Sequence, residues 1–140
     1  MSGMEVEKPL MEELFSKALK ASKNSYSPYS KFPVGAAVLF KSGNIFTGCN
    51  VENRSYGLTN CAERSALFSG VSSGEREIAA VAIAAPLADY PVGPCGACRQ
   101  VLTEFAEKNV PVIFGSSLKN VVTKTLGELY PFDSLHELAE

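Results

Sequence analysis

Three cysteines and one glutamate stand in the sequence at spacings suited to a catalytic metal site. Glu63 lies two residues after Cys61, and Cys95 and Cys98 form a Cys-x-x-Cys pair that Pro94 precedes. Cysteine thiolates are zinc ligands, and three protein ligands leave the fourth tetrahedral position open, as in catalytic zinc sites. Water in that position becomes a nucleophile near neutral pH, and Glu63 can approach it without being a ligand. The pattern predicts one zinc ion, as cofactor, and a carboxylate that moves protons.

Arg64 has a separate predicted role in the charge of this site. Three thiolates around Zn²⁺ leave one net negative charge, which makes a bound water harder to deprotonate. Arg64 follows Glu63 directly in the chain. Its guanidinium can therefore donate hydrogen bonds to the sulfurs from outside the coordination shell, and so offset that charge.

The same residues have simpler interpretations. Cys49 is the remaining cysteine of the four, and as a fourth ligand it would make the zinc site closed and structural. A Cys49→Ser variant would then lose zinc, whereas the catalytic interpretation treats Cys49 as a buried strand thiol. The pair Cys95 and Cys98 also suits a redox site of the thioredoxin type. Glu63 alone suits an acid in the first turn of a helix.

Two helix starts are expected to carry the ligands. Residues 61–71 have helical spacing with Asn60 as the expected N-cap, and a second helix is expected over residues 96–108. Helix N-termini carry partial positive charge and free N–H groups, which stabilise thiolates. The apolar run of residues 78–85, predicted as a strand buried on both faces, separates the two motifs. Neighbouring helix starts would bring three sulfurs to one ion.

The remaining segments predict the sheet and its other helices. Apolar residues at helical spacing after Pro9 indicate a helix over residues 9–23, and residues 26–33 indicate a loop. Further strands are predicted over residues 34–40, 45–51, 110–114 and 121–124, the first two as a hairpin with its turn at 41–44, and short helices over 125–130 and 133–139. This order predicts an α/β fold with three α-β-α layers and a mixed five-stranded sheet.

Length and composition favour one globular domain over residues 1–140, which the motifs above would make a catalytic domain. The chain has 13 basic and 15 acidic residues, a net charge of −2 and 46% hydrophobic residues. No basic stripe is visible, which disfavours nucleic acid as a partner. The N-terminal residues lack an apolar signal core, and no stretch has the roughly 20 apolar residues of a membrane span. A cytoplasmic protein without a membrane partner is expected.

At these motifs the sequence resembles the cytidine deaminase family, in its small homotetrameric branch. The Cys-x-Glu and Pro-Cys-x-x-Cys motifs match the pattern of zinc deaminases. The segments 32–37 (FPVGAA) and 48–53 (GCNVEN) resemble the family's first strand and its sugar-binding segment. The resemblance implies a zinc-dependent hydrolysis of cytidine and 2′-deoxycytidine to uridine and 2′-deoxyuridine, as in pyrimidine salvage. Glu63 would carry a proton from water to N3 of cytosine and then protonate the departing ammonia.

The resemblance also implies substrate contacts by position. Asn50 and Glu52 would hydrogen-bond the ribose, chiefly its 3′-hydroxyl, and Phe32 would pack against the pyrimidine. The backbone N–H of Ala62 would contact the base carbonyl. Tyr56 would help complete the site of a neighbouring subunit in a homotetramer.

The C-terminal segment departs from the family pattern. The usual Leu-Leu-Pro stretch and later Phe are shortened here to Leu129-Tyr130-Pro131-Phe132, and Phe132 is the candidate aromatic for a neighbour's site. Two other functions stay open: a zinc deaminase of another small aminopyrimidine, such as a nucleoside antibiotic, and a zinc-stabilised binding module without turnover. Asn50 and Glu52 favour a substrate with a sugar hydroxyl over the antibiotic.

Overall fold

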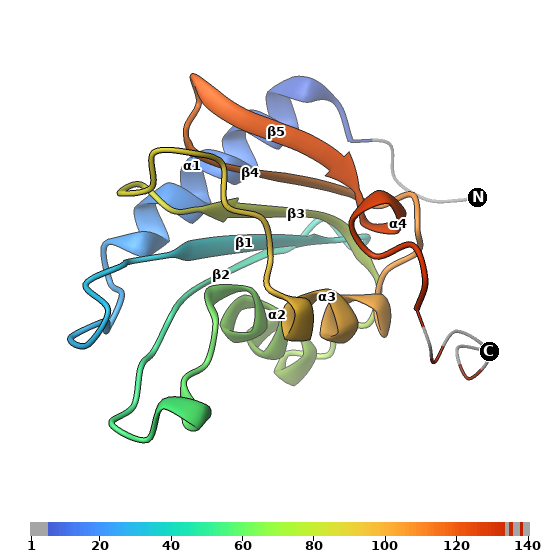
Figure 1. Cartoon of the computed structure of the whole chain (residues 1–140). Helices are drawn as coiled ribbons and strands as arrows, with labels where there is room; N and C mark the ends of the chain where they lie inside the picture. Colours follow the sequence, from blue (N-terminus) through green and yellow to red (C-terminus); the bar gives the residue numbers. More distant parts are fainter. Residues whose placement is uncertain (1–5, 134, 136–137, 139–140) are drawn as a thin grey trace.

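A five-stranded mixed sheet forms the middle of the molecule (Figure 1). The computed structural model describes residues 6–133, 135 and 138. The strands lie in the order β2-β1-β3-β4-β5; only β3 and β4 pair in parallel, and their neighbours are antiparallel. Their bounds are Gly35–Phe40 (β1), Ile45–Cys49 (β2), Ile78–Ala84 (β3), Pro111–Ser117 (β4) and Asn120–Thr125 (β5). The predicted mixed sheet of five strands is confirmed.

Helices cover both faces of this sheet. Helix α1 (Lys8–Ser22) lies on one face, and helices α2 (Ala62–Ser72) and α3 (Gly96–Thr103) lie on the other (Figure 1). Each side has its own hydrophobic core: Leu14 and Phe15 of α1 belong to one, and Leu67 of α2 and Leu102 of α3 to the other. A 3₁₀ turn, η1 (Tyr56–Leu58), and the short helix α4 (Leu126–Leu129) complete the described elements. The predicted α-β-α layering is confirmed.

Strand β3 is the most enclosed element. All seven of its residues are buried, because helices pack on both of its faces and strands flank both of its edges. A strand in this position needs apolar side chains on both faces. The continuous apolar run of the sequence therefore predicted this strand and its burial correctly.

Helix α3 ends earlier than the sequence predicts. The spacing indicated a helix to residue 108, but the helix ends at Thr103. The carbonyl of Phe105 instead accepts a hydrogen bond from the N–H of Ile78 at 2.9 Å, at the start of β3. Phe105 and Ala106 still pack against the core, which explains why the apolar spacing continued past the helix end. Most residues of the helix predicted over 133–139 lie outside the described part of the chain.

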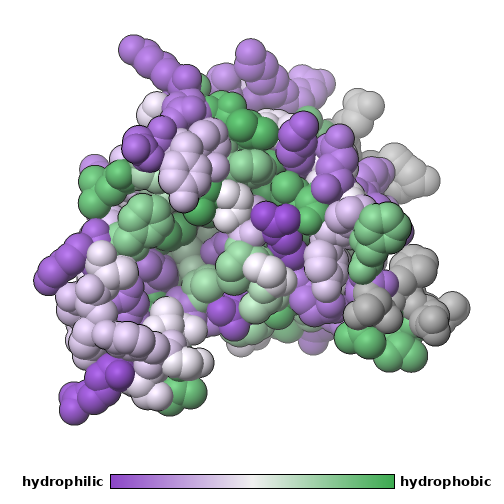
Figure 2. Space-filling view, viewed as in Figure 1, coloured by the Kyte–Doolittle hydropathy of each residue, from purple (hydrophilic) through white to green (hydrophobic). Residues whose placement is uncertain are grey.

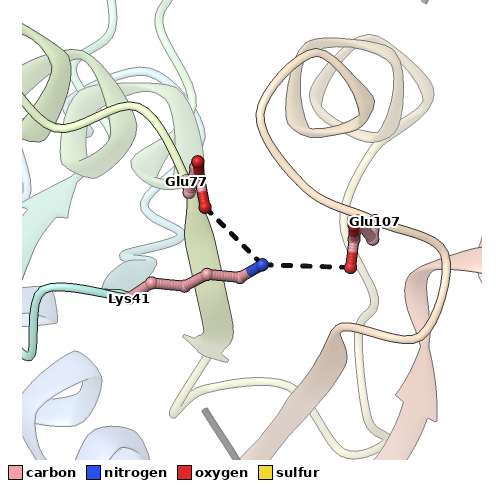
Figure 3. Close-up of polar contacts among 3 residues, drawn as sticks. All are labelled: Lys41, Glu77 and Glu107. Carbon is pink, nitrogen blue, oxygen red and sulfur yellow. Dashed lines mark ion pairs between the residues drawn. The ribbon is translucent and has the colours of Figure 1, made fainter. Parts of the chain in front are cut away.

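An exposed ion-pair group links three segments at the C-terminal end of β1. Lys41 Nζ lies 3.6 Å from Glu77 Oε1 and 3.9 Å from Glu107 Oε1, between the two carboxylates (Figure 3). Exposed ion pairs of this kind contribute about 0–1 kcal/mol to stability. The hydrophobic cores therefore determine the fold.

No helix within the described residues is long and apolar enough to cross a bilayer.

Candidate metal centre

Three cysteine sulfurs meet between the starts of α2 and α3. The Sγ atoms of Cys61, Cys95 and Cys98 all lie within 4.8 Å of one another, and those of Cys61 and Cys95 are 3.6 Å apart. Tetrahedral zinc with bonds of about 2.3 Å holds its sulfurs about 3.8 Å apart. All three cysteines are free thiols. The arrangement fits one zinc ion and leaves a fourth coordination position without a cysteine.

The two helix starts put the sulfurs in place. Cys61 and Cys95 are the N-cap residues of α2 and α3, both with extended backbones, and Cys98 lies in the first turn of α3. Neither cap residue makes a side-chain capping bond. The first N–H groups of both helices thus have no partner within their helix and direct positive potential toward the cluster.

The predicted N-cap of α2, Asn60, is wrong. Its side chain donates to the Ser65 hydroxyl at 3.1 Å instead of capping the helix. The Cys61 carbonyl accepts the first helical hydrogen bond, from the N–H of Ser65 at 3.1 Å, which makes Cys61 the cap. Asparagine is generally preferred at N-caps, but here the metal-site residue Cys61 takes that position.

The electrostatics of the cluster favour a cation. Hydrogen bonding with Cys98 and with Arg64 lowers the pKa of Cys61 to about 5, so this thiol is ionised at neutral pH. Cys98 forms a hydrogen bond with Cys61 and is buried near Glu63, and both effects raise its pKa. Binding of a divalent cation expels such a proton, because thiolates are the ligands. This chemistry fits zinc as the resident cofactor.

Glu63 lies beside the sulfurs on the first turn of α2. It is 4% exposed. Burial raises the pKa of Glu63 to about 7, while its own backbone N–H acts in the opposite direction. A carboxyl group whose pKa is near neutral can both accept and return a proton at physiological pH, which is the requirement for general acid–base catalysis.

Arg64 also contacts the cluster. Its Nη2 donates to Cys61 Sγ at 3.3 Å, and the neighbouring thiolates raise the pKa of the guanidinium further. Arg64 Nε is the buried side-chain polar atom without a hydrogen-bond partner among the described residues. The contact required for charge compensation by Arg64 is therefore present.

Cys49 stands apart from this cluster. It is the last residue of β2 and is half-exposed, so the expectation of a buried thiol is wrong. β2 is an edge strand, and Cys49 borders a groove against Lys17 and Lys20 of α1, on the other face of the sheet from α2. Within the described residues, the group of possible metal ligands contains Cys61, Cys95 and Cys98 without Cys49.

The residues expected to contact substrate fall into two groups. Asn50 and Glu52 follow β2 directly and hold the segment that contains Phe32. Ala62 is the first residue of α2, and its N–H is one of the groups without a helical partner. Tyr56 and Phe132, in contrast, are 73% and 91% exposed. Exposed aromatic side chains of this kind are available for contacts with another chain.

Two contacting residues have no predicted role in the sequence. Arg99 donates to the Pro94 carbonyl and to the Leu129 carbonyl, both at 2.7 Å, and so ties the segment before Cys95 to α4. Ser30 donates to the Glu52 carboxylate. The position of Arg99 directly after Cys98 was the one available signal; Ser30 had none, because its partner is 22 residues away.

Comparison with known proteins gives one consistent family. The sequence model for the cytidine and deoxycytidylate deaminase zinc-binding region matches residues 9–114. A cytidine deaminase of Sporosarcina psychrophila is 46% identical over 121 residues, which cover 86% of this chain and 88% of that protein. A blasticidin-S deaminase of Bacillus cereus is 32% identical over 109 residues, covering 73% and 76% of the two chains.

The fold leads to the same family. The crystal structure of a cytidine deaminase from Burkholderia pseudomallei superimposes with a TM-score of 0.80 at 44% identity, over 85% of this chain and 94% of that one. The family match includes all three cysteines of the cluster and Glu63. The chain belongs to the cytidine and deoxycytidylate deaminase zinc-binding family.

Proposed function

We propose that this protein is a zinc-dependent hydrolase that converts cytidine and 2′-deoxycytidine to uridine and 2′-deoxyuridine with release of ammonia. One observation carries the proposal: three sulfurs spaced for one zinc ion lie beside a buried carboxyl group, in a member of this family. A binding module without turnover would have no use for an open coordination position beside Glu63.

Each residue of the centre has a role in this reaction. Cys61, Cys95 and Cys98 would hold the zinc, and the zinc would make a water acidic enough to attack near neutral pH. Glu63 takes a proton from that water and delivers it to N3 of the cytosine while the water oxygen bonds to C4. Glu63 then carries the second water proton to the amino nitrogen, and the C4–N bond breaks to release ammonia. Such proton transfers contribute about 10²–10⁴ in rate.

The nucleoside is bound by residues around this centre. Phe32 packs on the pyrimidine, the Ala62 N–H contacts the base carbonyl, and Asn50 and Glu52 bind the ribose hydroxyl. The position of Asn50 and Glu52 two residues apart, directly after β2, supports this assignment.

The protein acts as one domain over residues 1–140, in a cytoplasmic homotetramer that serves pyrimidine salvage. The exposure of Tyr56 and Phe132 supports assembly, because each can reach a neighbour's site. On the face shown in Figure 2, hydrophobic residues lie in small groups among hydrophilic ones. The net charge of −2 supports a free nucleoside as substrate in place of nucleic acid.

Deamination assays test the proposal directly. Zinc-loaded protein is incubated with cytidine, 2′-deoxycytidine, cytosine and a cytidine nucleotide, and absorbance is followed. Both nucleosides are expected to be converted. Stable cytidine and deoxycytidine in the presence of one bound zinc per chain would falsify the proposed function. Blasticidin S belongs in the same assay because of the 32% identical relative; its faster conversion would favour the antibiotic.

The variant Glu63→Gln separates catalysis from zinc binding. It is expected to bind one zinc per chain and to keep the wild-type melting temperature, yet to lose turnover by about 10²–10⁴. Glu13→Gln, on the exposed face of α1, is the matched control and should keep full turnover.

A further inference from the structure

The turn that contains Ser30 is anchored on the carboxylate of Glu52. The backbone N–H groups of Tyr29 and Ser30 donate to Glu52 Oε1 at 3.0 and 3.2 Å, and the Ser30 hydroxyl donates to Oε2. The Ser30 hydroxyl in turn accepts from the Phe32 N–H at 3.1 Å. Ser30 therefore connects Glu52 to the backbone of Phe32.

Asn50 holds the other end of the same segment. Its Oδ1 accepts from the Ser25 hydroxyl at 2.5 Å and from the Val34 N–H at 2.9 Å. Its Nδ2 donates to the Phe32 carbonyl at 2.9 Å. The Asn50 side chain is buried, at 8% exposed. Asn50 and Glu52 thus fix the segment from both sides of Phe32.

The remaining hydrogen-bonding capacity of these two side chains is small. An asparagine amide has two donors and two acceptor lone pairs, and the described residues use three of the four, which leaves one N–H. A carboxylate has about four acceptor positions, and within the described part of the chain three are occupied, which leaves one on Oε2. One free donor and one free acceptor match a single hydroxyl group, which accepts one hydrogen bond and donates one.

We infer that Ser30 is a positioning residue that fixes the Glu52 carboxylate so that it offers one acceptor position to one substrate hydroxyl. The inference rests on the proposed function and adds the residue that makes the sugar contact selective. Without the Ser30 hydroxyl, Oε2 regains an acceptor position that water fills; the carboxylate keeps the two N–H bonds to Oε1 but loses the bond that holds Oε2. A site that hydrogen-bonds a hydroxyl discriminates against analogues that lack it only while its own groups are held in place.

The test compares two substrates in three variants. Ser30→Ala removes the hydroxyl, Ser30→Thr keeps it, and Ser42→Ala is the matched control, because Ser42 donates to the Glu75 carboxylate in the β1–β2 turn in the same way. The kcat and KM values are measured for cytidine. The ratio kcat/KM is measured for 3′-deoxycytidine with enzyme in excess over substrate, so that slow conversion is still quantified.

Ser30→Ala is expected to lower kcat/KM for cytidine about tenfold, mainly through KM, because an oriented hydrogen bond to a charged group is lost. The value for 3′-deoxycytidine should change less than about twofold by the same reasoning. Ser30→Thr should restore cytidine selectivity, and Ser42→Ala should leave both substrates unchanged.

Equal losses for the two substrates would overturn the inference, because Ser30 would then only support the loop. Unchanged cytidine kinetics in Ser30→Ala would overturn it as well. Both results leave the proposed function standing, since the wild type remains active. A zinc-loaded wild type that converts neither nucleoside would instead overturn the proposed function, and the inference with it.

Discussion

Arg64 is the residue that meets the negative charge of the metal centre. Its guanidinium donates to Cys61 Sγ at 3.3 Å. Three thiolates reduce the acidity of a water on the same ion, and a nearby cation restores part of it. Removal of a group that supports metal ligands in this way typically lowers metal affinity or activity by about 10–100-fold.

We predict that Arg64→Ala keeps one zinc per chain and loses about 10–100-fold in turnover. Zinc is measured by elemental analysis and turnover by cytidine absorbance. Arg76→Ala is the control, because Arg76, among the described residues, donates to the backbone carbonyls of Val71 and Glu75 and not to a cysteine. Wild-type turnover in Arg64→Ala would show that the sulfurs need no compensating charge.

The titration of Glu52 gives a second prediction at this scale. The hydroxyl of Ser30 is the main cause that lowers the pKa of Glu52 from 4.5, and the N–H groups of Ser30 and Tyr29 add to it. A folded-state pKa below the unfolded value means that ionised Glu52 stabilises the folded protein above pH 4.5, and that this contribution is lost as the pH falls through the folded pKa. Carboxyl NMR titration should therefore place Glu52 below 4.5 in the wild type.

In Ser30→Ala the Glu52 midpoint should move up toward 4.5, while Ser42→Ala should leave it unchanged. The stability lost as the pH falls from neutral through the folded-state pKa of Glu52 should shrink in Ser30→Ala for the same reason. A Glu52 midpoint that is the same in wild type and Ser30→Ala would mean that the hydroxyl does not stabilise the carboxylate.

The metal centre could be predicted from the sequence because its residues lie close together within two short motifs. The spacings of Cys61 to Glu63 and of Cys95 to Cys98 are fixed by the first turns of two helices, so residue type and distance along the chain predicted them. The supports were not predictable in this way. Arg99 bonds to Leu129 and Ser30 to Glu52, and those pairs meet only after the sheet has formed.

At the scale of elements, Gly48 allows α2 to lie close against β2. A Cβ atom at this position would be 2.5 Å from the backbone N of Ala66 and 2.7 Å from the Ser65 Cβ. Both neighbours belong to α2, whose first turn carries Cys61, Glu63 and Arg64. The missing side chain of Gly48 therefore sets the distance between the sheet and the metal centre.

We predict that Gly48→Ala pushes α2 outward, lowers the free energy of unfolding by about 1–3 kcal/mol, and weakens zinc binding. Thermal or urea unfolding and competition with a chelator measure the two effects. Gly57→Ala is the control, because a Cβ there meets no atom within 4 Å. If Gly48→Ala and the wild type resist the chelator equally, zinc binding does not depend on the close contact between Gly48 and α2.

Helices and strands could be predicted from the sequence where a single hydrophobic periodicity dominated the segment. The buried run of β3 and the apolar stripe of α1 gave correct elements, since each repeats the periodicity of its own structure. The end of α3 could not be predicted, because the Phe105 carbonyl just past the helix is bonded to the N–H of Ile78 in β3, which is distant in the sequence. Boundaries that depend on such long-range contacts leave no local signal.

At the scale of the whole molecule, aromatic residues gather on two neighbouring loops. The rings of Tyr29 and Tyr56 contact each other in a tilted arrangement, with centroids 5.8 Å apart and an interplanar angle of 60°, and both are exposed, as are Tyr26 and Leu58. Contiguous exposed apolar residues mark interaction surfaces. In the proposed homotetramer Tyr56 completes a neighbour's site, so each active site draws Glu63 and Tyr56 from different chains.

This arrangement predicts complementation between two impaired variants. Glu63→Gln damages the site of its own chain, whereas Tyr56→Ala damages the site of a neighbour. Co-expression with two affinity tags and purification on both isolates mixed assemblies. Some of their sites combine an intact Glu63 from one chain with an intact Tyr56 from the other, so turnover per chain should exceed that of either variant alone.

The matched control pairs Tyr56→Ala with a chain that carries both substitutions, Glu63→Gln and Tyr56→Ala, because half of the chains then keep Glu63 and no chain supplies Tyr56. Mass measurement in solution should give four chains per particle for the wild type and for the mixed assembly. Turnover of the mixed assembly no higher than that of the control would mean that each chain completes its own site. A monomeric wild type with full turnover would lead to the same conclusion.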